Sequence, residues 1–344
     1  MLDPSAVAAL LAERAAGRRV GIAVSGGGDS TALLVLLTQE LGADGIAVAT
    51  VDHGLRAGSA DEARLVADHC AGLGIPHDTL FWAERPAGGN LQDQARRARY
   101  RLLSDWARGR GIAAVTLGHT ADDNAETLLM GLTRGAGLDG LSGMRPTFTR
   151  QGVSFHRPLL HAQRADLRRV LQAHGVGWSE DPSNDDPRFD RVKMRAAMEV
   201  LAPLGITAAT LSRSIDNLRD SRTALTRTLA DWAARHVRQD RGDLVIAPDA
   251  MAALPADMAR RLLNAGLRWI SGRDYPPRAG SVMQIVASLT EPAGPADRTL
   301  HGCRLIPDRG ALRLTREAAA TGGPVASDAP WDGRWCLSGP HAPE

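Results

Sequence analysis

The sequence predicts an α/β protein: a Rossmann-like parallel sheet followed by a smaller, mostly helical domain. Three observations support this fold class. Short β-branched runs alternate with helical segments in the first half, a loop of three glycines follows the first run, and from about residue 206 a long helical pattern replaces the alternation. The 344 residues exceed the usual size of one domain, so two domains are expected.

Four short apolar runs are predicted to form parallel strands, at residues 20–25, 46–52, 77–81 and 114–118. The segments between them, 59–74, 91–111 and 120–135, carry apolar residues at helical spacing, begin with polar residues and end in glycine. The run FHRPLL, residues 155–160, predicts a last strand, and a helix follows it to about residue 174. This order of elements is typical of βαβ units.

A polar loop rich in Asp and Pro, residues 178–191, ends the alternation, and we place the domain boundary near 202–205. The predicted domains are therefore 1–204 and 205–317. The second begins with one long helix, 206–237, and continues with a short strand at 243–248, helices at 258–270 and 278–289, and a hairpin at 303–317. The tail, 318–344, is rich in Ala, Gly and Pro and is predicted to be loosely ordered.

Composition favours a soluble globular protein rather than a membrane or disulfide-rich protein. Hydrophobic residues make up 44% and charged residues 23% of the chain, and no apolar run reaches the roughly 18 residues that span a bilayer. The first 20 residues contain Asp3 and Glu13 and predict an amphipathic helix rather than a signal peptide. The three cysteines are far apart and form no CxxC pair. We therefore expect a cytoplasmic protein without a membrane partner.

The positive charge is almost entirely arginine, and Lys193 is the single lysine. A GC-rich genome is the simplest reason. Arginines nevertheless cluster at 94–111 and 164–171, where they indicate either a solvated helix face or a phosphate-binding surface.

The glycine loop joins the first strand to the following helix, which is where ligands collect in an open α/β sheet. Glycines let backbone N–H groups converge on an anion, and the start of a helix adds partial positive charge. The loop lacks the G-K-[ST] of a P-loop and the G-x-G-x-x-G of dinucleotide enzymes. A carboxylate beside phosphate requires a cation, so Asp29 implies Mg²⁺. The predicted phosphate-binding loop residues are Ser25, Gly26, Gly27, Gly28, Asp29 and Ser30, and a tight turn without a ligand is the alternative.

Four further blocks follow this S-G-G-x-D-S loop: VDHGLR at 51–56, QARRARY at 94–100, LGHTADDNAET at 117–127 and DPSNDDPRFDRVKMR at 181–195. The loop resembles that of ATP pyrophosphatases, which cleave between the α and β phosphates. In this order and spacing, the blocks resemble the tRNA(Ile)-lysidine synthetase family of the PP-loop superfamily, closely over 18–204 and loosely beyond. The resemblance implies ATP, free L-lysine and an isoleucine tRNA with the anticodon CAU as substrates.

The implied reaction begins when ATP adenylates the C2 carbonyl oxygen of the wobble cytidine. The lysine ε-amine then displaces AMP. A carbonyl oxygen is a poor leaving group whereas AMP is a good one, and the amine must arrive neutral, so a nearby base has a role.

On the helix after the fourth strand, Asp123 and Glu126 are three residues apart and share a face. Beside an ATP loop, two such acids suit the two ammonium groups of lysine. The alternative is a capped first turn, with Thr120 as N-cap and acids stabilising the helix start. His119, just before the helix, is predicted either to touch ATP or the base, or to be a histidine satisfied at a strand end.

By the resemblance, Arg96 is the functional arginine of QARRARY and could bind ATP phosphate or the lysine carboxylate. Asp52 and His53 end the second strand, where adenosine is expected. Arg191 and Arg195 are expected to bind substrate. Two positions depart from the family pattern: Val192 stands where Asn is usual, and Asn124 replaces a frequent Gln.

Three other functions share parts of this pattern. Sulfur-inserting tRNA enzymes use a CxxC pair or a catalytic cysteine, and Cys70 is the single thiol of the first domain. Ammonia-using synthetases normally carry a glutaminase partner. A non-enzymatic nucleotide-binding module would need the glycines but not the paired acids. The sequence does not determine the oligomeric state, and a homodimer is one of the alternatives.

Overall fold

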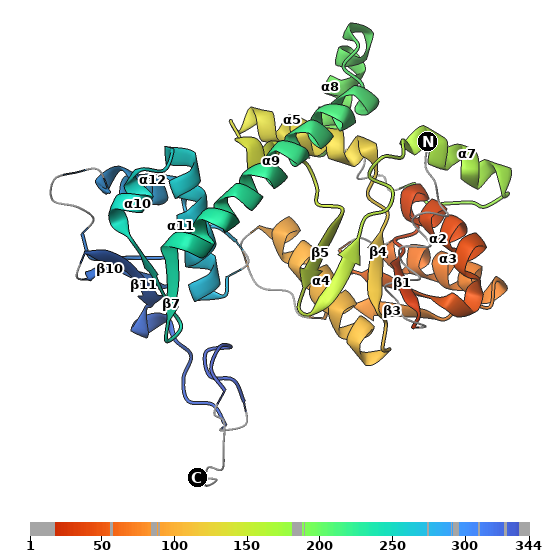
Figure 1. Cartoon of the computed structure of the whole chain (residues 1–344). Coiled ribbons are helices and arrows are strands. Elements are labelled where there is room, and N and C mark those ends of the chain that lie inside the picture. The colour runs from red at the N-terminus through yellow and green to blue at the C-terminus, as the bar shows by residue number, and fades with distance from the viewer. Residues whose placement is uncertain are drawn as a thin grey trace. The chain divides into compact units, whose positions relative to one another are not determined.

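The computed structural model describes residues 18–55, 58–83, 88, 90–180, 188, 190–273, 275–289, 291, 296–308, 310–326 and 329–336. The predicted N-terminal helix and most of the predicted polar loop lie outside these ranges. The chain forms two compact units, residues 1–222 and 223–344, which we describe separately (Figure 1). Among the described residues, no helix combines the length and apolar character needed to cross a bilayer.

The first unit contains a six-stranded sheet in the order β3-β2-β1-β4-β6-β5. Strands β1, β2, β3, β4 and β6 are parallel, and β5 pairs antiparallel with β6 at the edge. The predicted parallel sheet is therefore confirmed. The strands span Val20–Ala23 (β1), Ile46–Asp52 (β2), His77–Phe81 (β3), Ala114–Leu117 (β4), Thr147–Arg150 (β5) and Val153–His156 (β6).

Helices cover both faces of this sheet (Figure 1). Side chains of α2, α3 and α7 share one core cluster with one face of β1 and β2, whereas α4 shares another with β4 and β6. Burial on both faces explains why the strands are nearly continuous apolar runs. The helices are α2 (Gly28–Leu41), α3 (Ser59–Gly72), α4 (Leu91–Gly109), α5 (Ala121–Thr133), α6 (Leu138–Leu141), α7 (Arg164–Ala173) and α8 (Asp190–Leu201), with short 3₁₀ turns at Ala43–Gly45 and Ala202–Leu204.

The last predicted strand is shifted along the chain. FHRPLL was expected to be extended over 155–160, but β6 ends at His156 and a turn follows. The chain leaves the sheet at Arg157, whose backbone N–H donates to Pro146 O at 2.8 Å. Edge strand β5 was not predicted because its residues alternate between exposed and half-buried positions.

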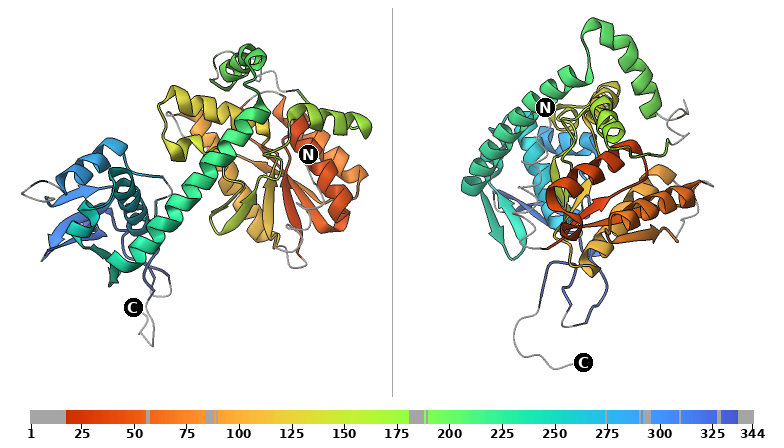
Figure 2. Two further views of the ribbon diagram at one scale, coloured as in Figure 1. Left: turned by 45° about the horizontal axis from the view of Figure 1, so that its top comes forward. Right: turned by 90° about the vertical axis from the view of Figure 1, so that its right-hand side faces the viewer.

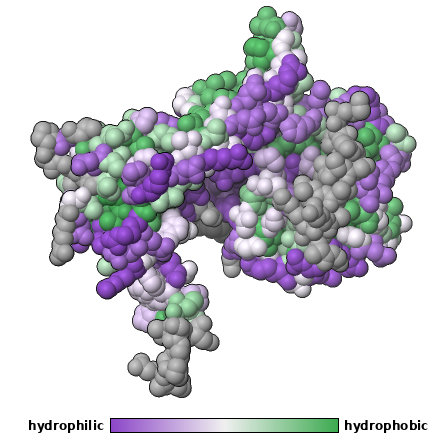
Figure 3. All heavy atoms as spheres, viewed as in Figure 1, coloured by the Kyte–Doolittle hydropathy of each residue, from purple (hydrophilic) through white to green (hydrophobic). Residues whose placement is uncertain are grey.

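Helix α8 is attached to the first unit without a buried apolar face. It has no buried residue, and Val200 and the neighbouring Leu204 are 74% and 75% exposed. Hydrophobic residues gather on the surface at the outer end of α8 (Figure 3). Polar contacts near the candidate site described below therefore matter more for its placement than core packing.

The long helix α9, Ala208–His236, confirms the predicted helix and contains the division between the units. Its first half belongs with the first unit, where Leu218 O accepts a hydrogen bond from Ser142 Oγ at 3.3 Å. Its second half contributes Leu225, Leu229 and Trp232 to the other core. The division of the chain between the two units therefore falls within α9, at 222–223, whereas the sequence placed it near 202–205.

The second unit packs helices against a five-stranded antiparallel sheet in the order β7-β8-β11-β10-β9 (Figure 2). The hairpin predicted at 303–317 is formed by β10 and β11, while β7 and β9 were not predicted. The elements are β7 (Val237–Asp240), β8 (Asp243–Ile246), α10 (Pro248–Ala252), α11 (Ala256–Ser271), α12 (Ala279–Ser288), β9 (Arg298–Leu300), β10 (Cys303–Asp308), β11 (Ala311–Arg316) and a 3₁₀ turn at Ala318–Ala320.

The described part of the tail contacts the second unit. Arg316 donates to Asp332 from Nε at 2.8 Å and from Nη2 at 3.0 Å. Arg334 donates from Nη1 to Ile270 O at 3.1 Å, and its guanidinium lies 5.2 Å from the ring centroid of Trp269. Residues 331–335 are therefore held against the sheet and α11.

Candidate active site

The glycine loop joins β1 to the first turn of α2. Gly26 has a φ of +87°, a backbone conformation that favours glycine, and Gly28 begins the helix. Ser30 closes the loop: its Oγ donates to Gly27 O at 2.9 Å and accepts from the Ser25 N–H at 3.1 Å. Ser25 Oγ lies 3.2 Å from Ser30 Oγ. The loop therefore presents backbone and two hydroxyls at a helix N-terminus, an arrangement suited to phosphate.

Two other chain segments approach this loop. Ser179 pairs with Gly27 in a β-bridge and donates its N–H to Gly26 O at 2.9 Å. Gly118, at the end of β4, lies so close that a Cβ there would be 2.8 Å from Ser30 Cα. This contact places the β4–α5 turn directly against the start of α2.

We expect Gly118→Ala to impair ATP turnover, because the added methyl meets backbone rather than a flexible side chain. Overpacking of this kind costs about 1–3 kcal/mol, and relief would require the β4–α5 turn to move away from Ser30. Pyrophosphate release and thermal unfolding should both be measured. Gly109→Ala is the matched control, since, apart from its sequence neighbours and the backbone of its own helix, no atom of the described residues lies within 4 Å of the corresponding Cβ. Wild-type turnover in Gly118→Ala would show that the contact is dispensable.

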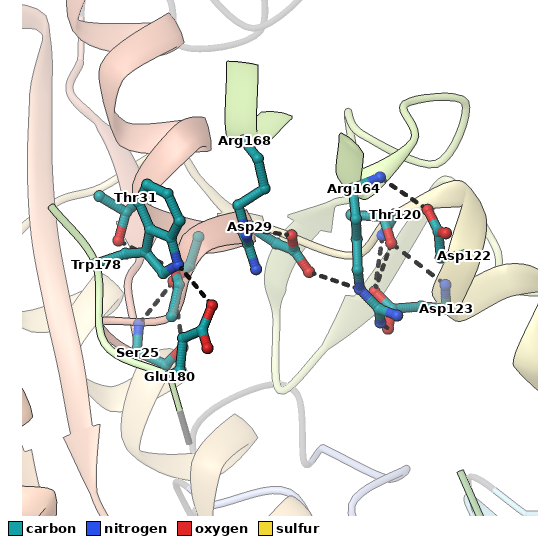
Figure 4. Close-up of polar contacts among 12 residues, drawn as sticks. Ser25, Asp29, Thr31, Thr120, Asp122, Asp123, Arg164, Arg168, Trp178 and Glu180 are labelled. Carbon is teal, nitrogen blue, oxygen red and sulfur yellow. Dashed lines mark hydrogen bonds and ion pairs between the residues drawn. The ribbon is translucent and has the colours of Figure 1, made fainter. Parts of the chain in front are cut away.

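Arg164, at the start of α7, is at the centre of the site (Figure 4). Its guanidinium donates from Nε to Asp29 Oδ2 at 3.2 Å, from Nη1 to Glu126 Oε1 at 2.9 Å, and from Nη2 to Asp123 Oδ1. Its backbone N–H donates to Asp122 Oδ2 at 2.8 Å. Carboxylates from two helices thus converge on one cation beside the glycine loop.

A second arginine of α7 also reaches the glycine loop. Arg168 Nη1 donates to Asp29 Oδ1 at 3.3 Å, and its guanidinium lies 5.0 Å from the ring centroid of Trp178. The absence of a side chain at Gly28 allows this approach, because a Cβ there would be 1.6 Å from the same Nη1. Asp29 is therefore bound by two guanidinium groups.

The environment acts differently on the two aspartates. Burial and the nearby charge of Asp123 raise the pKa of Asp29, and the attraction of Arg164 and Arg168 only partly offsets them. Burial opposes ionisation of Asp123 as well, but Arg164 and the Thr120 N–H hold the pKa of Asp123 below its usual value. Asp123 is consequently a fixed negative charge at neutral pH.

Asp123 also belongs to a capping box at the start of α5. Thr120 Oγ1 accepts from the Asp123 N–H at 3.3 Å, and Asp123 Oδ2 accepts from the Thr120 N–H at 2.9 Å. The predicted capped first turn is therefore confirmed. It coexists with the ion pair because the cap uses Oδ2 and Arg164 uses Oδ1.

Glu126 lies one turn along α5 and is 1% exposed. Its Oε1 accepts from Arg164 Nη1 and from Arg195 Nε at 2.8 Å. Its Oε2 is buried, and within the described residues it has no hydrogen-bond partner. A buried carboxylate oxygen that is left open is available to a further donor.

The other predicted residues lie around this cluster with fewer contacts. Asp52 and His53 are at the end of β2, and Asp52 Oδ1 accepts from the Gly54 N–H at 2.7 Å. Since β2 and β4 both pair with β1, their ends flank the glycine loop. Arg191 is exposed on α8, and its charge lowers the pKa of Asp123. Arg96 is exposed on α4 and makes none of the contacts of the Arg164 cluster.

Sequence reasoning did not assign Arg164, Arg168 or Arg157 to the site. The first two lie within the cluster 164–171 noted above, and their spacing of four puts them on one face of α7. The signal that distinguishes them from a solvated face is their position at the start of the helix after the last strand. Arg157, inside FHRPLL, donates from Nε to His119 Nδ1 at 3.2 Å.

The thiol of the first unit does not fit a reactive role. Cys70 is completely buried in the core on α3, and burial raises the pKa of its thiol to about 11. A thiol of this kind is the opposite of the exposed, low-pKa group that sulfur chemistry requires. This observation disfavours the sulfur-inserting alternative.

The family match and the similar proteins described below agree with one another. Residues 4–201 match the PP-loop domain family. The chain is 48% identical to the tRNA(Ile)-lysidine synthase of Ruegeria pomeroyi over 94% of this chain and 77% of that one. It is 40% identical to the enzyme of the same name from Bradyrhizobium diazoefficiens over 82% and 81%.

Among solved structures, the U34-tRNA thiolase NcsA of Methanococcus maripaludis superposes with a TM-score of 0.50 over 62% of this chain and 78% of that one. Its sequence identity is 16%, so this likeness concerns the fold alone. The PP-loop match and the two close relatives decide the family. The chain belongs to the tRNA(Ile)-lysidine synthase family of PP-loop, ATP-dependent ligases.

Proposed function

We propose that the chain acts in the cytoplasm and joins L-lysine to C2 of the wobble cytidine of isoleucine tRNA bearing the anticodon CAU. ATP adenylates the C2 oxygen with release of pyrophosphate, and the lysine ε-amine then displaces AMP. The observation that carries the proposal is the convergence of Asp29, Asp123 and Glu126 on one guanidinium beside the glycine loop. This arrangement sets a cation-binding group of acids next to an anion-binding loop.

The glycine loop is proposed to bind the phosphates of ATP. Gly26, Gly27 and Gly28 supply backbone without side-chain obstruction, and Ser25 and Ser30 supply hydroxyls. Asp52 and His53, beside the loop on β2, are proposed to contact adenosine. His119 and Arg96 are proposed to complete the nucleotide site from β4 and α4.

Asp29 is the proposed protein ligand of Mg²⁺. Mg²⁺ is usually bound by one or two carboxylates together with substrate phosphates, and Asp29 lies half-buried where the phosphates are expected. The ion pairs of Asp29 with Arg164 and Arg168 support this role, because they show that positive groups can reach this carboxylate. A bound Mg²⁺ would supply charge neutralisation between phosphate and carboxylate.

Asp123 and Glu126 are the proposed partners of the lysine ammonium groups. Both are buried and face one cation, and Glu126 Oε2 is open to another donor. Arg164 contacts both acids, so a substrate cation that binds them has to share or displace these contacts. Arg195, on Glu126, and Arg191 are proposed to contact substrate from α8.

The direct test incubates the protein with ATP, Mg²⁺, labelled lysine and total tRNA. We expect label in tRNA, with AMP and pyrophosphate formed in equal amounts. Isoleucine and methionine tRNAs with the same anticodon, transcribed separately, test the choice of substrate. ATP cleavage without label in any tRNA would contradict the proposed acceptor while leaving the PP-loop chemistry intact.

Residues 205–317 are proposed to position the tRNA, with α9 as a basic contact. Arg213 and Arg227 are exposed on this helix. We expect the double variant Arg213→Gln/Arg227→Gln to bind tRNA more weakly. Each lost phosphate contact should also reduce the slope of log K against log salt by about 0.7–0.9. Arg64→Gln is the control, since Arg64 is exposed on α3. Unchanged affinity and slope in the double variant would exclude α9 from the tRNA surface.

A further inference from the structure

Arg157 is a buried arginine whose contacts include no carboxylate among the described residues. It is 9% exposed, donates from Nη1 to Arg145 O at 2.6 Å and from Nη2 to Tyr100 Oη at 3.4 Å, and lies 4.4 Å from the ring centroid of Phe148. Burying a cation without an acid is costly. The free-energy cost of burying Arg157 indicates that this residue has a role beyond packing.

The third nitrogen of the Arg157 guanidinium, Nε, donates its N–H to Nδ1 of His119 at 3.2 Å. A guanidinium has donors and no acceptor, so Nδ1 must accept this hydrogen bond. The imidazole is therefore neutral and carries its hydrogen on Nε2. Within the described residues, no protein group pairs with Nε2, which leaves this N–H for a ligand.

The net charge around His119 also favours the neutral imidazole. Arg99 of α4, Arg157 after β6 and Arg191 of α8 oppose protonation of His119, and Asp123 of α5 partly offsets them. Burial and these arginines lower the pKa of His119 to about 3. The imidazole stays neutral over the whole range in which an enzyme of this kind works.

We infer that Arg157 is a positioning residue: its hydrogen bond fixes His119 as the Nε2–H tautomer, which donates to an anionic oxygen of the nucleotide. The inference rests on the proposed function and deepens it. Nδ1 is occupied and Nε2 already carries hydrogen, so His119 cannot take the proton of the lysine ε-amine. That proton leaves by another route, and His119 stabilises charge instead.

The position of Arg157 is fixed well enough for this task. Its guanidinium plane is held by Arg145 O on one branch, Tyr100 Oη on the other and the face of Phe148, so Nε has little freedom. Phe148 is in turn stacked on Phe155, with centroids 5.2 Å apart. The aromatic cluster therefore aims the hydrogen bond at His119.

The first experiment measures the tautomer in the full-length protein by ¹⁵N NMR of labelled histidine, with His119→Ala to assign the signals. We expect wild-type His119 to show an unprotonated Nδ1 and a protonated Nε2 that do not titrate above pH 5. Arg157→Met should release the tautomer and let the ring titrate, whereas Arg157→Lys, which keeps a charged donor, should restore at least part of the wild-type pattern. A protonated Nδ1 in the wild type would overturn the inference.

The second experiment follows the pH dependence of kcat for lysine incorporation. In Arg157→Met, burial and Arg99 still oppose protonation, so the pKa of His119 should rise from about 3 but stay below its ordinary value of about 6.5. A pKa at that ordinary value would leave about a quarter of the ring neutral at pH 6 and nearly all of it at pH 8, which sets the upper limit of the effect. The loss relative to wild type should then be up to about fourfold larger at pH 6 than at pH 8. A merely structural role for Arg157 would lower activity equally at both.

Arg150→Met is the matched control. Arg150 also lies over the Tyr100 ring, 5.1 Å from its centroid, but has no contact with His119. This variant should keep both the wild-type tautomer and the wild-type pH profile. An Arg157→Met protein with unchanged His119 signals would refute the inference. A wild-type protein without lysine incorporation would count against the proposed function, and the NMR would still decide the tautomer.

Discussion

Replacing Asp29 with alanine should abolish ATP turnover, with a loss of at least about 10²-fold in the rate of pyrophosphate release. Asp29 is the acid of the glycine loop, and in the structure Arg164 and Arg168 both contact it. Without this carboxylate, the proposed Mg²⁺ loses its protein ligand. The two guanidiniums are also left beside the phosphate site with no acid to balance them.

The conservative variant separates these two effects. Asp29→Asn keeps the size of the side chain but removes its charge, so pyrophosphate release should also be lost. If the loss comes from weaker metal binding, raising the Mg²⁺ concentration should recover part of the activity. Asp105→Ala is the control, because Asp105 forms an exposed ion pair with Arg108 on α4. Pyrophosphate release at the wild-type rate in Asp29→Ala would refute the assignment of the loop.

The parts of the fold that could be predicted are those with a local signal. Strands β1, β2 and β4 are short apolar runs because helices bury both of their faces, and the glycine loop is visible as three consecutive residues. The edge strands β5, β7 and β9 have no comparable signal, since most of their residues are exposed or half-buried. They acquire strand structure by pairing with partners already in the sheet.

The position of Arg164 at the centre of the site could not be predicted from local sequence patterns. Arg164 is separated along the chain from Asp29 by 135 residues, from Asp123 by 41 and from Glu126 by 38. The sequence placed each acid correctly at a strand-to-helix junction, but the position of α7 over α2 depends on the core that Leu167 and Leu171 enter. The pairing of Arg157 with His119 is equally non-local, because it joins the ends of two neighbouring strands.

The acids of α5 allow the lysine step to be tested apart from the ATP step. Asp123→Asn keeps an oxygen that can accept the Thr120 N–H, so the capping box survives while the charge is lost. Glu126→Gln likewise keeps an acceptor for Arg195. Each variant therefore removes one negative charge from the proposed lysine site with little change to the helix.

If these acids hold the lysine ammonium groups, both variants should carry out adenylation and fail at the attack. Loss of a positioned charge partner or base typically costs about 10²–10⁴ in rate, so lysine incorporation should fall by that order. Pyrophosphate release that depends on tRNA should persist for one turnover, because Ser25 to Ser30 are unchanged. A single-turnover assay that follows pyrophosphate and labelled tRNA together measures both steps.

The control for this experiment is Asp122→Asn, on the same turn of α5. Asp122 accepts a hydrogen bond from the backbone N–H of Arg164 and not from its guanidinium. An asparagine at this position can still accept the backbone hydrogen bond. Both steps should remain near the wild-type rate in this variant. If Asp123→Asn and Glu126→Gln instead lose pyrophosphate release and lysine transfer to the same extent, the two acids act by holding Arg164 for ATP binding. The ammonium groups of lysine must then be bound elsewhere.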